Sequence, residues 1–188
     1  DVEAKLHAEL DTVLGGRAPA LADLPQLPYT RAVFDEALRL YPPVPILPRE
    51  ALRDEVYQGT PIPKWSLVLV VPWLLHRHRK LWDKPDAFIP ERFLAADAAP
   101  SKFAYVPFSI GPRVCAGMSF GQTEALLCLA TLAQAFRLRL VPGHEVRPVC
   151  RLTLRPEGGL PMRLEPRHPA PAVSTRARAP QPLQCPLG

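Results

Sequence analysis

The residue best suited to chemistry is Cys115, which lies in the segment FSIGPRVCAG at positions 108–117. A helix is predicted directly after this loop, over residues 117–135. At such a junction the sulfur meets unpaired backbone N–H groups and the positive end of the helix dipole, and both favour a thiolate over a thiol. The competing interpretation is a small buried hydrophobic residue, which most single cysteines are.

The neighbours of Cys115 are suited to a flat cofactor with anionic groups. Gly111 and Gly117 allow the backbone to turn tightly and to approach such a cofactor closely. Phe108 offers a ring that can pack beside the sulfur, and Arg113 offers a cation for an anionic group.

A second candidate group is charged and lies earlier in the chain. Glu36 and Arg39 are three residues apart in a predicted helix over 28–40, so their side chains share one face and can pair. The alternative is a solvated surface pair, which is worth only a few tenths of a kcal/mol.

Three motifs together resemble the cytochrome P450 family. The 108–117 segment is similar to the family's heme-binding signature, F-x-x-G-x-R-x-C-x-G, at all its fixed positions. Glu36 and Arg39 resemble the E-x-x-R of the family's K helix, and residues 90–93, PERF, resemble its P-E-R-F loop, in the same order. The resemblance covers nearly all of residues 1–165 and implies the C-terminal, heme-ligating part of that fold, mainly α with small β-sheets.

The resemblance also implies roles for single residues. Cys115 would be the axial ligand of the iron of heme b, with Phe108, Gly111 and Gly117 around it, and Arg113 and Arg49 would contact the heme propionates. Glu36, Arg39 and Arg92 would form a buried cluster that fixes the long irregular segment 80–106, the meander, beneath the heme. His76 and His78 have a spacing that could chelate a metal, but they fall in the family's H-R-x-x-x-x-W segment with Trp82 and are expected to be structural.

The implied activity is a monooxygenase that inserts one oxygen atom of O₂ into a small hydrophobic substrate. Its electrons would come from NAD(P)H through a ferredoxin or a flavoprotein reductase, which could face Lys102, Arg137 or Arg139. Residues 43–47 and 157–160 would line the substrate pocket. The alternatives are a heme-thiolate isomerase or peroxygenase on the same scaffold, and an inactive truncated interaction module.

The remaining elements follow from periodicity and turn residues. A first helix is predicted over 1–14, and the helix over 117–135 is predicted to be largely buried because apolar residues surround it. Extended segments are predicted at 44–49, 55–57, 66–71, 136–140, 150–155 and 162–164. The Pro-, Ala- and Arg-rich tail, 166–188, is expected to be disordered.

Composition excludes several classes of protein. Of 23 Lys and Arg residues three lie in the tail, and the rest nearly balance 18 Asp and Glu, so no nucleic-acid surface is expected. The four cysteines lack zinc-site spacing. The apolar run at 67–75 is far short of the roughly 20 residues that cross a bilayer, so a cytoplasmic location is expected.

Because the chain opens inside a helix at Asp1, we expect a truncated N-terminus, and these 188 residues alone should be unstable and inactive.

Overall fold

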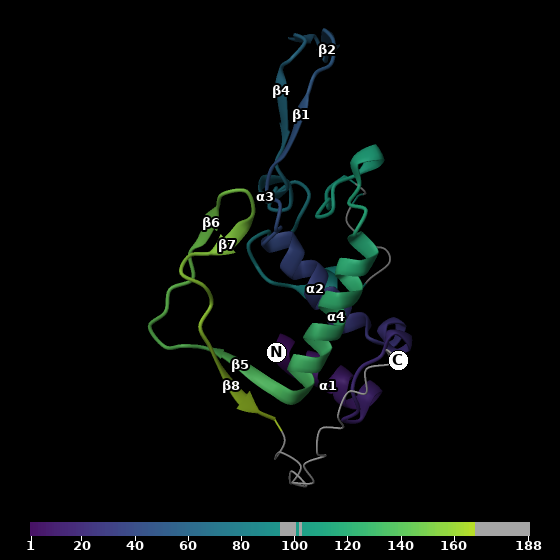
Figure 1. Ribbon diagram of the computed structural model, residues 1–188, viewed down its shortest axis with the longest axis vertical. Coiled ribbons are helices and arrows are strands. Elements are labelled where there is room, and N and C mark those ends of the chain that lie inside the picture. The colour runs from purple at the N-terminus through teal and green to yellow at the C-terminus, as the bar shows by residue number, and fades with distance from the viewer. Residues whose placement is uncertain (95–100, 102, 168–188) are drawn as a thin grey trace, which may run out of the picture.

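Helices form the centre of the molecule, as the computed structural model of residues 1–94, 101 and 103–167 shows (Figure 1). The helices are α1 (Val2–Leu14), α2 (Pro28–Leu40), α3 (Pro72–Leu75) and α4 (Met118–Ala135), with 3-10 turns η1 (Leu21–Gln26), η2 (Pro90–Phe93) and η4 (Gly111–Arg113). The strands are β1 (Leu47–Glu50), β2 (Glu55–Tyr57), β3 (Thr60–Ile62), β4 (Leu67–Val70), β5 (Phe136–Leu140), β6 (Pro148–Cys150), β7 (Leu154–Pro156) and β8 (Met162–Pro166). The predicted class, mainly α with small β-sheets, is confirmed.

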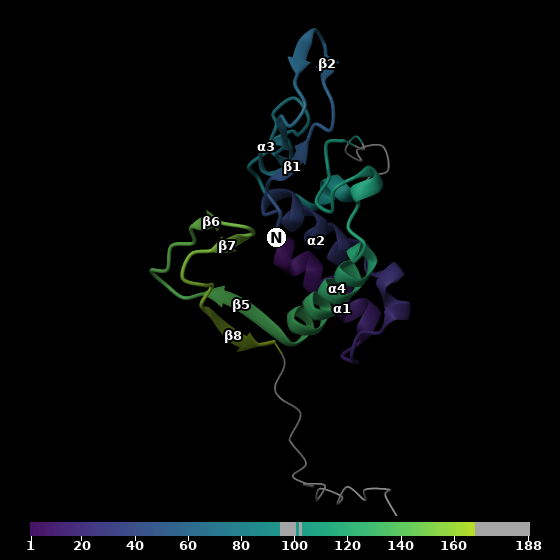
Figure 2. The same cartoon turned by 45° about the horizontal axis from the view of Figure 1, so that its top comes forward.

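The strands pair as small antiparallel ladders, β1 with β4, β2 with β3, β5 with β8 and β6 with β7. The first two ladders make a finger that projects from the helices in both views, and the last two lie together beside the helices (Figure 2). Residues 168–188 lie outside the described part of the chain. Their disorder stays a prediction, but the first two residues of the expected tail are ordered, because Pro166 ends β8, one residue past the expected boundary at 165, and Arg167 pairs with Asp11 (2.6 Å).

The core lies where α1 meets α4 and the start of α2. Leu6, Leu10 and Leu14 form a buried stripe along α1, spaced four residues apart as one face of a helix requires. They pack against Ala130 and Ala133 of α4, whose small side chains allow the two helices to approach closely. This contact sets the direction in which α4 leaves the Cys115 loop.

Helix α4 is less buried than its sequence predicts. Only Leu126, Ala130 and Ala133 are buried, whereas Phe120 is 74% exposed. Apolar residues surround this helix, but the described elements that pack against it, mainly α1, α2 and η1, leave Phe120 exposed. Within the described residues no helix is both long and apolar enough to cross a bilayer.

The predicted strand at 150–155 was wrong. The chain turns inside it, so β6 ends at Cys150 and β7 begins at Leu154, with the Arg151 N–H donating to the Thr153 carbonyl across the turn. Apolar–polar alternation predicts an extended backbone, but it carries no information on where the backbone reverses.

Helix α2 begins at a carboxylate that α1 supplies. The N-cap, Leu27, makes no side-chain hydrogen bond. Instead Glu9 accepts the backbone N–H groups of Tyr29 (2.6 Å) and Thr30 (2.8 Å) and the Thr30 hydroxyl (2.7 Å). A negative charge at a helix N-terminus also complements the helix dipole. Glu9 therefore fixes α2, and with it Glu36 and Arg39, against α1.

Replacing Glu9 should destabilise the protein. Glu9→Ala leaves two N–H groups and a hydroxyl of the first turn of α2 without their acceptor, at a cost of about 1–3 kcal/mol in the free energy of unfolding. Urea unfolding of Glu9→Ala and of Glu124→Ala, an exposed helical glutamate on α4, measures the effect. Equal stability of the two variants would contradict this role for Glu9.

Candidate functional site

Cys115 lies at the end of a tight loop that leads into α4. Its N–H donates to the Phe108 carbonyl (2.9 Å), which closes the loop, and its carbonyl accepts the Met118 N–H (3.2 Å) at the start of the helix. Cys115 is a free cysteine and is exposed. The predicted loop-to-helix position is therefore the observed one, and the sulfur is open to a ligand.

The two glycines of the loop serve different purposes. Gly111 has a φ of +71°, which side-chain-bearing residues rarely adopt, so the tight turn requires glycine there. Gly117 also lies in a turn, but its φ of −88° is one that other residues adopt, so the turn does not require glycine at this position. A Cβ at Gly117 would lie 4.0 Å from the Cys115 sulfur, so its absence keeps the space beside the sulfur open.

Strand β1 brings Arg49 to the same loop. The Arg49 Nη2 atom donates to the Ser109 hydroxyl (3.1 Å), across 60 residues of sequence. Arg113 ends η4, two residues before Cys115, and both arginines are exposed. Arg113 thus lies within the Cys115 loop, and Arg49 lies next to it on a separate element. Phe108, at the start of the loop, is half-buried.

Glu36 and Arg39 form the most deeply buried charge pair described. Both side chains have 0% exposure, and two hydrogen bonds join them, from Arg39 Nε to Glu36 Oε2 (2.7 Å) and from Arg39 Nη2 to Glu36 Oε1 (2.9 Å). Arg39 donates its other protons to the carbonyls of His76 (2.7 Å), Pro85 (2.6 Å) and Ala87 (2.9 Å). All five guanidinium donors are therefore used.

Glu36 also holds the meander from the other side. Its Oε1 atom accepts the Ile89 N–H (2.7 Å) and Arg92 Nε (3.2 Å). The indole of Trp82 packs against the guanidinium of Arg39, 5.0 Å from the ring centroid. The structure thus brings together the three charged residues that the motifs single out, and they clamp residues 76–92 onto α2.

The sequence did not single out Tyr105 and gave His76 only a general structural role. The Tyr105 hydroxyl lies 3.1 Å from Asp35 Oδ1, and its ring contacts those of His76 and Trp82. Burial raises the pKa of Tyr105, with Asp35 adding to the shift. An aromatic residue near the end of the meander, just before the Cys115 loop, was the available signal.

His76 and His78 do not face one another as metal ligands. His76 is fully buried and its Nε2 accepts the Val106 N–H (2.9 Å), whereas His78 is exposed. Within residues 1–94, 101 and 103–167 no group of three or more His, Cys, Asp or Glu could hold a metal ion.

Arg39→Lys tests the buried pair. Lysine has three donors in place of five and cannot reach Glu36 with a bidentate fork, so buried carbonyls and a carboxylate lose partners. We expect a loss of about 3–5 kcal/mol in the free energy of unfolding, measured in urea. Arg53→Lys, in an exposed ion pair with Glu55, is the matched control and should leave it unchanged. A fully stable Arg39→Lys variant would contradict this.

Several known proteins resemble the chain over most of its length. Cyclooctatin synthase from Streptomyces melanosporofaciens is 46% identical over 166 residues, which are 88% of this chain and 36% of the relative. Pentalenene oxygenase from Streptomyces avermitilis is 36% identical, over 90% of this chain and 38% of the relative. The crystal structure of the cytochrome P450DA heme domain matches with a TM-score of 0.82 and 33% identity, over 89% of this chain and 38% of that one.

This chain therefore spans little more than a third of the length of the relatives it matches. The family model described as Cytochrome P450 matches residues 1–161, which is most of the chain. Sequence relatives and structural neighbours agree with that match, and the chain belongs to the cytochrome P450 family.

Proposed function

We propose that this chain supplies the thiolate-donating side of a heme monooxygenase, with Cys115 as the axial ligand of the iron. The observation that carries the proposal is the free, exposed cysteine at the start of α4, in a loop that a buried ion cluster and Arg49 support. Oxygenation, in place of rearrangement of a peroxide, is supported by a relative named as an oxygenase, which acts on pentalenene.

The residues around Cys115 fit a heme. Residues 111–117 are exposed, so a flat group can lie against them, and Gly117 leaves the sulfur uncrowded. Arg49 and Arg113 offer guanidinium groups for two carboxylates. Cys115 is the only protein ligand proposed for the iron, and the porphyrin itself would supply the others that hold it.

When bound, the heme supplies oxygen activation, which a cysteine thiolate promotes by donating electron density to the iron. The part of this chain is to prepare that ligand. Cys115 lies directly before the first turn of α4, and its exposed side chain would be the ligand that this chain offers to the iron. The hydrogen bond from the Cys115 N–H to Phe108 fixes the loop, and the Glu36–Arg39 pair fixes the meander that leads into it.

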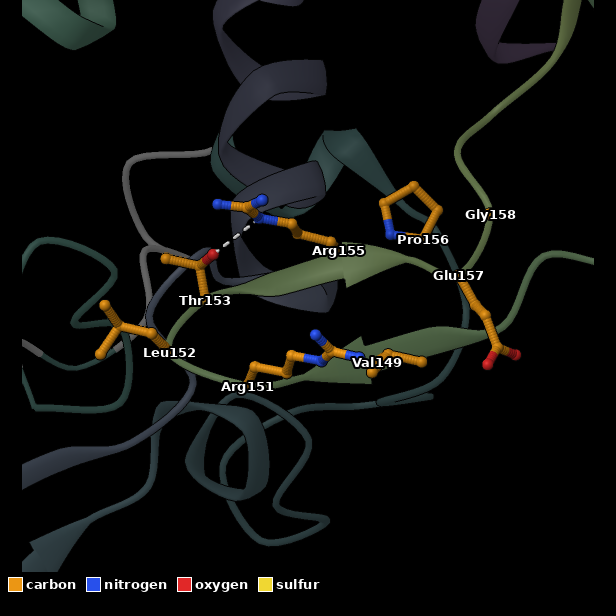
Figure 3. A pocket seen from close by; sticks show the side chains of 8 residues that line it. All are labelled: Val149, Arg151, Leu152, Thr153, Arg155, Pro156, Glu157 and Gly158. Carbon is orange, nitrogen blue, oxygen red and sulfur yellow. Dashed lines mark hydrogen bonds between the residues drawn. The ribbon is translucent and has the colours of Figure 1, made fainter.

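A hydrophobic substrate is supported by an apolar cavity of about 310 Å³. It is lined by Pro45, Ile46, Val71, Trp73, Pro148, Cys150 and Leu154. A hydrogen bond from the Leu154 N–H to the Pro43 carbonyl (2.9 Å) joins the β6–β7 hairpin to the expected 43–47 segment. The other expected segment, 157–160, begins at a separate hollow of about 370 Å³ on the hairpin, beside Arg151 and Arg155 (Figure 3).

The two strand arginines expected to face the electron donor are exposed but paired with acidic residues of this chain. Arg139 pairs with Glu3 (3.0 Å) and Glu165 (3.5 Å), and Arg137 pairs with Glu3 (3.4 Å), so both are already partnered. Lys102 lies outside the described residues. A ferredoxin or flavoprotein donor carrying NAD(P)H electrons, and the cytoplasmic location, stay predictions.

Cys115→Ser should abolish thiolate ligation. The reduced, carbon-monoxide-bound protein should lose the red-shifted Soret band that a thiolate ligand produces. Cys128 is also exposed but lies within α4, so Cys128→Ser is the matched control and should retain the band. A red-shifted band in Cys115→Ser would end the ligand assignment, and a wild-type protein that takes up no stoichiometric heme would end the proposed function.

Arg49→Gln and Arg113→Gln should each weaken heme binding. A charge-assisted hydrogen bond to a propionate is lost in each variant, and we expect a roughly tenfold rise in the heme Kd. Arg53→Gln, whose side chain is 82% exposed on the finger, is the control and should bind as the wild type does. The Kd is measured by heme titration, and an unchanged value in both variants would remove the propionate role.

A further inference from the structure

His76 touches both the buried ion cluster and the chain that leads to Cys115. Its carbonyl accepts Arg39 Nη1 (2.7 Å), and its side-chain Nε2 accepts the Val106 N–H (2.9 Å). The imidazole has no exposed surface, and its Nδ1 has no hydrogen-bond partner.

Val106 is the point from which the Cys115 loop departs. Val106 is buried, and its carbonyl accepts the Ser109 N–H (3.1 Å). Phe108, two residues further, accepts the Cys115 N–H (2.9 Å). The backbone of Val106 is thus held by His76 on one side and starts the turn of the loop on the other.

We propose that His76 is a positioning residue for Cys115, which uses Nε2 to hold the Val106 amide and so keeps the Cys115 loop in register with the Glu36–Arg39 pair. Its consequence for heme ligation rests on the proposed function. The contact of His76 with the loop backbone does not depend on the proposed function, because both hydrogen bonds lie within the chain.

The protonation state of His76 decides whether this contact exists. A nitrogen that accepts an N–H carries no proton, so the neutral ring has its proton on Nδ1. Burial, together with the charges of Arg39 and Arg77, lowers the pKa of His76 to about 4, although the backbone groups of Arg39 and Leu38 oppose this shift. The facing ring, Tyr105, is kept neutral because burial raises its pKa.

Because the buried His76 is neutral, the stability of the folded chain depends on pH. Between the ordinary histidine pKa of about 6.5 and the folded value of about 4, the unfolded chain binds a proton that the folded chain excludes. Stability therefore falls as the pH drops through that window. A proton on Nε2 would also face the Val106 N–H, so protection of this amide should fall over the same range.

The test uses two substitutions in the longest natural form of the protein. His76→Phe keeps a ring but removes the acceptor, and His76→Gln restores an acceptor that does not titrate. Amide hydrogen exchange at Val106 and Cys115 is measured between pH 7.5 and pH 4.5, together with the Soret band of the reduced, carbon-monoxide-bound form. The same changes at exposed His78 are the controls.

We expect His76→Phe to lower the protection factors of both amides roughly tenfold, as loss of one hydrogen bond implies, and to reduce the thiolate-type Soret band. His76→Gln should stay within about twofold of the wild type and lose the pH-dependent fall below pH 6.5. Unchanged protection at Cys115 in His76→Phe, or equal losses in His76→Phe and His76→Gln, would overturn the proposal. Because amide exchange needs no heme, this readout decides the positioning role even where the proposed function fails.

Discussion

The structure depends on the charge pair between Glu36 and Arg39, which is fully removed from water. Burying two ions costs several kcal/mol each, and their mutual attraction offsets this only when every donor and acceptor is also hydrogen-bonded. Here the partners are the carbonyls of Pro85 and Ala87 and the N–H of Ile89, all from the meander. The pair therefore requires the meander in place, and the meander, which has little regular structure, is ordered by the pair.

The position of the Cys115 loop also depends on this charge pair. Arg39 fixes the backbone of His76, whose imidazole fixes Val106, and the Cys115 loop begins there. Trp82 covers the guanidinium of Arg39 and donates its indole N–H to the Leu75 carbonyl (3.2 Å). A buried charge cluster is thus connected, through His76 and Val106, to a loop that is itself exposed. Such an arrangement fixes a ligand on one side while leaving its other side accessible.

Local signals predicted the parts of the site that local geometry determines. Three-residue spacing on a helix was enough to pair Glu36 with Arg39, and a loop before a helix was enough to place Cys115. The resemblance to a family added Arg92, because no spacing relates residues 56 positions apart. The burial of α4 and the strand at 150–155 were mispredicted, since periodicity reports neither which neighbours are present nor where a strand turns.

The contacts that the sequence could not predict are also those that make the cluster cooperative. Arg39 reaches carbonyls that lie 37, 46 and 48 residues along the chain, and Glu36 reaches an N–H 53 residues away. The four partners lie within residues 76–89, so closing one loop brings all of them close to the charge pair. The entropy cost of that closure grows only slowly with loop length. Each further hydrogen bond then adds stability with little extra ordering. Removing a single donor would leave the ordering cost in place and a buried group unpaired, so each contact depends on the others being made.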